Sequence, residues 1–280
     1  MQFQDFAKAH GLIINSLSYD KWVRVPTTDH PYKKNGAYIY NGHRGAVQNW
    51  ATMEKPAVWK SEEKTHQPAN LTRILRAADD RKELADKAAA KAGWIMHHTV
   101  MQSHPYMERK GFPDEKWPVW EDNGERKLVI PMRIGDRLVG CQLINEQGEK
   151  KFLYGQTTKG ASFLMDAKGI PIFCEGFATG NSIRLAMKSS NLRYCIYVCF
   201  SAGNLKEVAR AVGNGIIVAD NDPSHVGQSV AIETGHPYWI SSTTGEDFND
   251  YHNKVGIFTA SQSLKKVLMP HYTSQAFSQK

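Results

Sequence analysis

The sequence lacks any apolar run of the eighteen or so residues that a membrane-spanning helix requires. Its first residues, Met1 to His10, also lack the basic segment followed by an apolar segment that marks a secretory signal. We therefore expect a cytoplasmic protein without a membrane partner.

Cysteine is scarce. The chain has four cysteines, and none precedes Cys141. Three of the four lie in apolar, strand-like runs, where a free thiol behaves as a small hydrophobic group. A zinc site normally places such ligands in turn-rich loops with a second pair nearby, and Cys195 and Cys199 have no such pair. We expect no zinc and, in a cytoplasmic protein, no structural disulfide.

A nucleotide-hydrolysing motor is missing as well. Residues 155–160 resemble a phosphate-binding loop but lack the Gly-Lys-Ser/Thr ending of a Walker motif. We therefore expect no fused helicase in this sequence, and a separately encoded helicase partner stays open.

Charge is present in excess of one sign. The chain carries 35 Lys and Arg against 28 Asp and Glu, a net charge of +7. Cationic proteins favour polyanionic partners, because each phosphate that they neutralise releases condensed counterions. Many metabolic enzymes carry a similar excess, so the charge supports a nucleic-acid partner without establishing one.

Composition and periodicity divide the chain into five parts. In order they are a small β-rich module at 1–58, a charged helical linker at 59–98, a basic strand-rich subdomain at 99–166, a domain of alternating strands and helices at 167–270, and a polar tail at 271–280. We expect an α/β fold, α+β overall.

The fourth part indicates a parallel sheet. Short apolar runs at 170–174, 194–200 and 216–219 alternate with helical patterns at 179–188 and 205–212. This alternation is typical of parallel sheets flanked by helices, in which ligands bind at the carboxyl ends of the strands.

Three acidic residues follow those strands directly. Glu175 comes after the first run, and Asp220 and Asp222 come after the third. If the two strands are neighbours, the three carboxylates converge at one edge of the sheet. Carboxylates packed so closely repel one another unless a cation lies between them, and hard oxygen ligands select Mg²⁺ or Mn²⁺.

The segment 220–223, Asp-Asn-Asp-Pro, could instead be a simple turn, because Asp, Asn and Pro all favour turns. That interpretation leaves unexplained the Glu-Gly pair after the earlier strand. It also leaves unexplained the later acidic cluster of Glu246, Asp247 and Asp250. We therefore favour the metal site.

Several segments resemble the Toprim domain. Residues 173–179 (Phe-Cys-Glu-Gly-Phe-Ala-Thr) resemble its strand–Glu–Gly signature, and residues 217–222 resemble its DxD strand. Residues 247–250 (Asp-Phe-Asn-Asp) resemble the closing motif of Toprim primases of phages and plasmids. The basic strands within 126–155 are similar to those of bacterial DnaG-type primases, and parts of 24–50 resemble mobile-element primases.

The resemblance implies a DNA primase that joins nucleoside triphosphates on single-stranded DNA, in the cytoplasm of a bacterial host during phage or plasmid replication. It makes Glu175 the metal-organising acid–base residue, while Asp220 and Asp222 hold the Mg²⁺ or Mn²⁺ ions. Asp250 and Asp247 complete the acidic patch. The zinc ribbon of many primases is absent here, which leaves the template initiation sequence open.

Basic and aromatic side chains are candidates for contacts with template or triphosphate: Lys127, Arg133, Arg137, Lys151 and Lys159 in the strand-rich part, and Lys34, Arg44 and Trp50 in the N-terminal module. Basic residues interleaved with aromatic residues suit single-stranded nucleic acid. Each charge could equally be a solvated surface group, and each aromatic residue could be part of a core. Two alternative functions stay open, a Toprim nuclease and a non-catalytic DNA-binding accessory protein.

Overall fold

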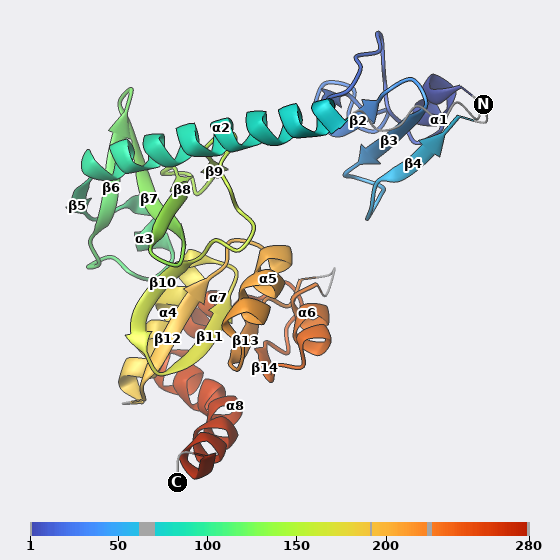
Figure 1. The fold of residues 1–280 in the computed structure, drawn as a ribbon. Helices are drawn as coiled ribbons and strands as arrows, with labels where there is room; N and C mark the ends of the chain where they lie inside the picture. Colours follow the sequence, from blue (N-terminus) through green and yellow to red (C-terminus); the bar gives the residue numbers. More distant parts are fainter. Residues whose placement is uncertain (1, 62–70, 191, 223–225, 279–280) are drawn as a thin grey trace. The chain divides into compact units, whose positions relative to one another are not determined.

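The computed structural model of the chain describes residues 2–61, 71–190, 192–222 and 226–278, and the fold is mixed α/β (Figure 1). The chain divides into two compact units, Met1–Ile74 (unit 1) and Leu75–Lys280 (unit 2). Linker residues 62–70 and Pro223 of the acidic turn lie outside the described residues.

Unit 1 contains a four-stranded antiparallel sheet and a short helix, α1 (Phe3–Ala9). Its strands pair in chain order: β1 (Val23–Val25), β2 (Gly36–Tyr40), β3 (Arg44–Asn49) and β4 (Ala57–Lys60). The sequence predicted a small β-rich module here. It did not predict β3 and β4, whose apolar residues are few and interrupted by polar ones.

One face of this sheet forms the core of unit 1. Val23, Tyr38 and Val47 are cross-strand neighbours on that face and pack with Phe3 of α1. The ring of Phe3 lies so close to Gly45 that a side-chain methyl there would collide with it. Because side chains alternate along a strand, the intervening residues point to the opposite face.

Unit 2 begins with an antiparallel sheet that α2 (Leu71–His97) crosses (Figure 1). The strands again pair in chain order: β5 (Val100–Gln102), β6 (Trp117–Asp122), β7 (Glu125–Ile134), β8 (Arg137–Ile144) and β9 (Lys150–Phe152). A short helix, α3 (Pro105–Arg109), lies between β5 and β6 in the chain. Ala88, Ala92 and Ile95 of α2 are buried against Val129 and Cys141 of the sheet.

The second sheet of unit 2 has the strand order β10-β12-β11-β13-β14. Its strands are β10 (Phe163–Lys168), β11 (Ile170–Cys174), β12 (Tyr194–Val198), β13 (Ile216–Ala219) and β14 (Tyr238–Ile240). All neighbours are parallel except the edge strand β10, which pairs antiparallel with β12. The parallel pairing predicted for the three apolar runs is therefore present.

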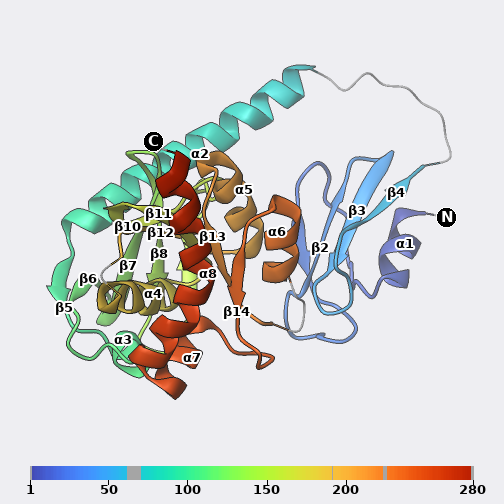
Figure 2. The ribbon, with the colours of Figure 1, turned by 90° about the horizontal axis from the view of Figure 1, so that it is seen from below.

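Helices cover both faces of the parallel sheet (Figures 1 and 2). Alternate residues of β11 and β13 point to opposite sides, so Ile172 and Val218 join one core while Phe173 and Ile217 join the other. The first face is covered by α4 (Phe177–Ser189), α7 (Phe248–Val255) and α8 (Ile257–Ser278). The second face is covered by α5 (Ala202–Val212) and α6 (Val226–Thr234).

The ends of two helices bear on the sequence prediction. Within the charged helical linker expected at 59–98, α2 continues past Gly93 to His97, because burial of Ile95 outweighs the cost of about 1 kcal/mol for a helical glycine. The stretch 271–278, expected to be a frayed tail, is part of α8. Among the described residues, no helix is both long and apolar enough to cross a membrane.

Candidate active site

Glu175 lies where β11 ends and α4 begins. Gly176 is the N-cap of α4 in an extended conformation, and the Glu175 carbonyl accepts a hydrogen bond of 2.9 Å from the Phe200 amide after β12. The pKa of Glu175 is raised, first by burial and then by the negative charge of Asp222. The backbone N–H of Ala202 in α5 and the charge of Lys150 offset part of that rise.

Asp220 follows β13, which pairs directly with β11 through Ile172–Ile216 and Phe173–Ile217. The two acidic strand ends are therefore adjacent, as the sequence predicted. Burial raises the pKa of Asp220 to about 7, with smaller contributions from Glu175, Asp247 and Asp222. Its Oδ1 atom is buried and has no hydrogen-bond partner among the described residues.

The loop that precedes α7 is attached to the same edge of the sheet. Asn221 donates from its side chain to the Ser241 carbonyl at 2.9 Å, and its backbone N–H lies 3.4 Å from the Glu246 carbonyl. Asp247 is the N-cap of α7, and its carboxylate accepts a hydrogen bond of 2.8 Å from the Asp250 amide. The negative charges of Glu175, Asp247 and Asp222 all raise the pKa of Asp220. We call these four carboxylates the carboxylate edge.

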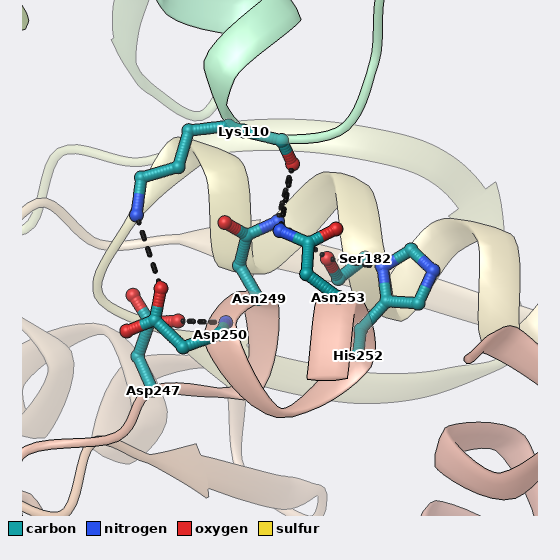
Figure 3. Close-up of polar contacts among 7 residues, drawn as sticks. All are labelled: Lys110, Ser182, Asp247, Asn249, Asp250, His252 and Asn253. Carbon is teal, nitrogen blue, oxygen red and sulfur yellow. Dashed lines mark hydrogen bonds and ion pairs between the residues drawn. The ribbon is translucent and has the colours of Figure 1, made fainter. Parts of the chain in front are cut away.

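Asp250 lies apart from the carboxylate edge. Its carboxylate lies 3.4 Å from the Lys110 ammonium, as Figure 3 shows. It is not among the charges that shift the pKa of Asp220, whereas it contributes to raising the pKa of the buried Tyr106 to about 12, after burial itself and the charge of Asp247. The structure thus places Asp247 with the predicted metal ligands and Asp250 against Lys110.

A buried polar network fixes α7 against its neighbours (Figure 3). The amide of Asn249 donates to the Lys110 carbonyl at 2.8 Å and to Ser182 Oγ of α4 at 3.0 Å. Ser182 Oγ lies 3.0 Å from His252 Nδ1, and burial lowers the pKa of His252. A neutral His252 can accept a hydrogen bond from the Ser182 hydroxyl at Nδ1, which leaves Ser182 Oγ free to accept from Asn249.

The donor set of the carboxylate edge fits a hard divalent cation. The charge of Lys150 favours the ionised forms of Glu175 and Asp220, and the buried Asp220 Oδ1 has no hydrogen-bond partner in the part of the chain that the structure describes. Oxygen ligands of this kind suit Mg²⁺ or Mn²⁺ with additional waters and phosphate oxygens. Within the described ranges, no three His, Cys, Asp or Glu side chains are already arranged to hold one metal ion.

Lys150 was missed as a site residue by sequence reasoning, which selected Lys151. Lys150 pairs with Ile144 and Lys151 with Leu143, so the two lysines occupy consecutive positions on the edge strand β9 and point to opposite faces. Lys150 lowers the pKa values of Glu175 and Asp220, whereas Lys151 acts on Glu125. The alternation of side chains along a strand predicts that the two lysines point to opposite faces. Only the placement of the sheet shows which of them lies toward the carboxylate edge.

The other predicted basic contacts in unit 2 have varied surroundings. Lys127 forms ion pairs with Asp122 at 2.7 Å and Glu125 at 3.2 Å. Arg133 donates to the Asp136 carbonyl at 2.6 Å. The remaining two are exposed: Arg137 at the start of β8, and Lys159, which lies 3.3 Å from Glu207.

The predicted contacts of unit 1 are all exposed. Lys34 precedes β2, and Arg44 begins β3, where it lines a small pocket with Asp20 and Asn41. Trp50 follows β3 directly and is 49% exposed. The indole ring of Trp50 is therefore partly accessible at the surface of unit 1.

Comparisons with known proteins add little. No protein-family model matches the chain, and a search of curated proteins finds no match. Among solved structures, the fold is similar to a chain in a complex of the bacteriophage T7 lagging-strand DNA polymerase with primase domains of two gp4 subunits bound to an RNA/DNA hybrid and dTTP. The TM-score is 0.43 at 12% identity, covering 60% of this chain and 91% of that chain. A likeness of this size does not establish a shared activity.

Proposed function

We propose that the protein is a DNA primase, a metal-dependent nucleotidyltransferase that makes short primers on single-stranded DNA during phage or plasmid replication. The observation that carries the proposal is the carboxylate edge. Glu175 and Asp220 follow adjacent parallel strands, and both have raised pKa values because burial and neighbouring carboxylates oppose their ionisation. The motif resemblance supports a Toprim-type assignment for this parallel sheet.

In this proposal Asp220 and Asp222 hold Mg²⁺ or Mn²⁺, with Asp247 beside them. The bound cation supplies charge neutralisation for the phosphates and for the attacking and leaving oxygens. Glu175 orients the ligands and accepts the proton of the primer hydroxyl, for which a raised carboxylate pKa is favourable. Asp250 remains paired with Lys110 and positions α7.

The remaining partners follow from charge. Lys150 is placed to contact a phosphate that approaches the carboxylate edge, since its charge already acts on Glu175 and Asp220. Exposed Arg137 and Lys151 are available for the template backbone. A separately encoded replicative helicase is a further proposed partner.

Primer synthesis by the full chain tests the proposal. The assay uses single-stranded DNA, labelled ribo- and deoxyribonucleoside triphosphates, and Mg²⁺ or Mn²⁺ with a chelated control. We expect metal-dependent short products from the wild-type protein and from Asp136→Ala, which removes an exposed carboxylate in a turn. Asp220→Ala and Glu175→Gln should abolish them.

Two results would reject the primase assignment. Metal-dependent loss of the template without products, absent in Asp220→Ala, would identify a nuclease at the same site. Synthesis that survives in both Asp220→Ala and Glu175→Gln would show that the carboxylate edge does not carry the chemistry.

A further inference from the structure

The face of the unit 1 sheet opposite α1 carries a distinctive row of side chains. Arg24, Ala37 and Gln48 lie side by side on β1, β2 and β3. Trp22 and Trp50 are two residues beyond Arg24 and Gln48, so alternation places them on the same face. These residues, together with Pro56, line an open cavity of about 370 Å³.

Two aromatic rings of the cavity are accessible to a partner. Trp22 and Trp50 are 53% and 49% exposed, while Ala37 is buried. The guanidinium of Arg24 lies 4.0 Å from the centroid of the Trp50 ring. We call this cavity, bordered by Trp22, Arg24, Ala37, Gln48 and Trp50, the tryptophan cradle.

Unit 1 carries an excess of positive charge, part of it on the face of the tryptophan cradle. Residues 1–61 contain eight Lys and Arg residues against four Asp and Glu residues. Arg44 and Lys60 are directly opposite each other across β3 and β4, on the same face as Arg24. Two positive charges directly opposite each other destabilise a sheet, because they repel. An anionic partner bound between them would reduce this repulsion.

We propose that this face binds single-stranded nucleic acid, with one base stacked in the tryptophan cradle and adjoining phosphates against Arg44 and Lys60. An exposed aromatic ring accepts any base, because every base has a π-face, and a nearby arginine adds a cation–π contribution. The proposal rests on unit 1 alone and does not depend on the chemistry at Asp220.

The test measures binding of a fluorescein-labelled oligothymidylate to the full chain by fluorescence anisotropy. The double variant Trp22→Ala/Trp50→Ala should bind roughly 5-fold to 150-fold more weakly, the range for one lost base stack. Trp94→Ala is the matched control, because Trp94 of unit 2 is also 53% exposed. It should bind as the wild-type protein does.

A second measurement separates stacking from folding and from charge. Oligothymidylate should quench tryptophan fluorescence in the wild-type protein, and Trp22→Phe/Trp50→Phe should lose that quenching while retaining most of the affinity. Arg44→Ala/Lys60→Ala should reduce the dependence of affinity on salt, because phosphate contacts release counterions.

Binding of Trp22→Ala/Trp50→Ala within about twofold of the wild-type value overturns the proposal, as does an equal loss in Trp94→Ala. So does undiminished quenching in the phenylalanine variant. Failure of primer synthesis leaves this result unaffected, because Asp220→Ala should bind oligothymidylate normally. Conversely, if primer synthesis is normal but substitution of Trp22 and Trp50 leaves oligothymidylate binding unchanged, only this inference is rejected.

Discussion

Asp220 gives the sharpest test of the carboxylate edge, because its environment opposes the charge that it must carry. Burial raises its pKa from the ordinary value of 3.8 to about 7. The folded protein therefore retains a proton that the unfolded chain releases between these two values. Stability is fully retained below the lower value and falls as pH rises toward the higher one.

The magnitude follows from the same shift. Each pKa unit corresponds to about 1.4 kcal/mol, so the full difference is about 4 kcal/mol. Asn has nearly the same shape and no charge. We expect the stability advantage of Asp220→Asn over the wild-type protein to grow by about 2 to 3 kcal/mol between about pH 5 and about pH 8.

Urea unfolding in the presence of a chelator measures this advantage. Asp136→Asn, a change at an exposed turn, should track the wild-type protein at both pH values. Saturating Mg²⁺ should then stabilise the wild-type protein at the higher pH, by about 2.7 kcal/mol at a hundredfold excess over the dissociation constant. Asp220→Asn should gain much less. Identical responses of the two proteins to pH and to Mg²⁺ would refute the reasoning.

Three further changes probe the surroundings of the site and the core of unit 1. Asn249→Ala should lower the free energy of unfolding, measured in urea, by about 2 to 3 kcal/mol, because it removes the hydrogen bonds to Lys110 and Ser182. Asn253 is exposed and also donates to the Lys110 carbonyl, so Asn253→Ala should lower the free energy of unfolding by less than about 1 kcal/mol. Lys150→Ala should raise the KM for nucleoside triphosphates about fivefold, corresponding to about 1 kcal/mol, because it removes the positive charge that acts on Glu175 and Asp220. Lys151→Ala should leave the KM within about twofold of the wild-type value. A larger effect of Lys151→Ala than of Lys150→Ala would exclude Lys150 from the site. Gly45→Ala should destabilise unit 1 by about 1 to 3 kcal/mol in thermal unfolding, because the new methyl collides with the aromatic ring of α1; an unchanged melting temperature would contradict that packing.

The sequence placed the acidic residues at strand ends correctly because that part of the inference is local. A short apolar run, a following acidic residue and a Gly that starts a helix can all be read within ten residues. Convergence also required that the two strands be neighbours, and the direct pairing of β11 with β13 meets this condition.

Lys150 and Asn249 could not be found in the same way. One residue of register on β9 decides which of two lysines faces the carboxylates, and nothing in the three-residue strand specifies it. The role of Asn249 depends on the Lys110 carbonyl, 139 residues away in the chain. Long-range contacts of this kind leave no periodic signal, so the motif was read for its two acids and not for its amide.

The carboxylate edge conflicts with what stability alone would favour. Within the described ranges the buried Oδ1 atom of Asp220 has no hydrogen-bond partner, and the charges that raise its pKa are those of other carboxylates. A residue needed only for the fold would be better as Asn, which fills the same space without a charge. Conflicts between local environment and residue type concentrate at functional sites, where a ligand resolves them. The divalent cation that we propose at the carboxylate edge would resolve this one, because it would bring positive charge to the carboxylates and a partner to the Asp220 oxygen.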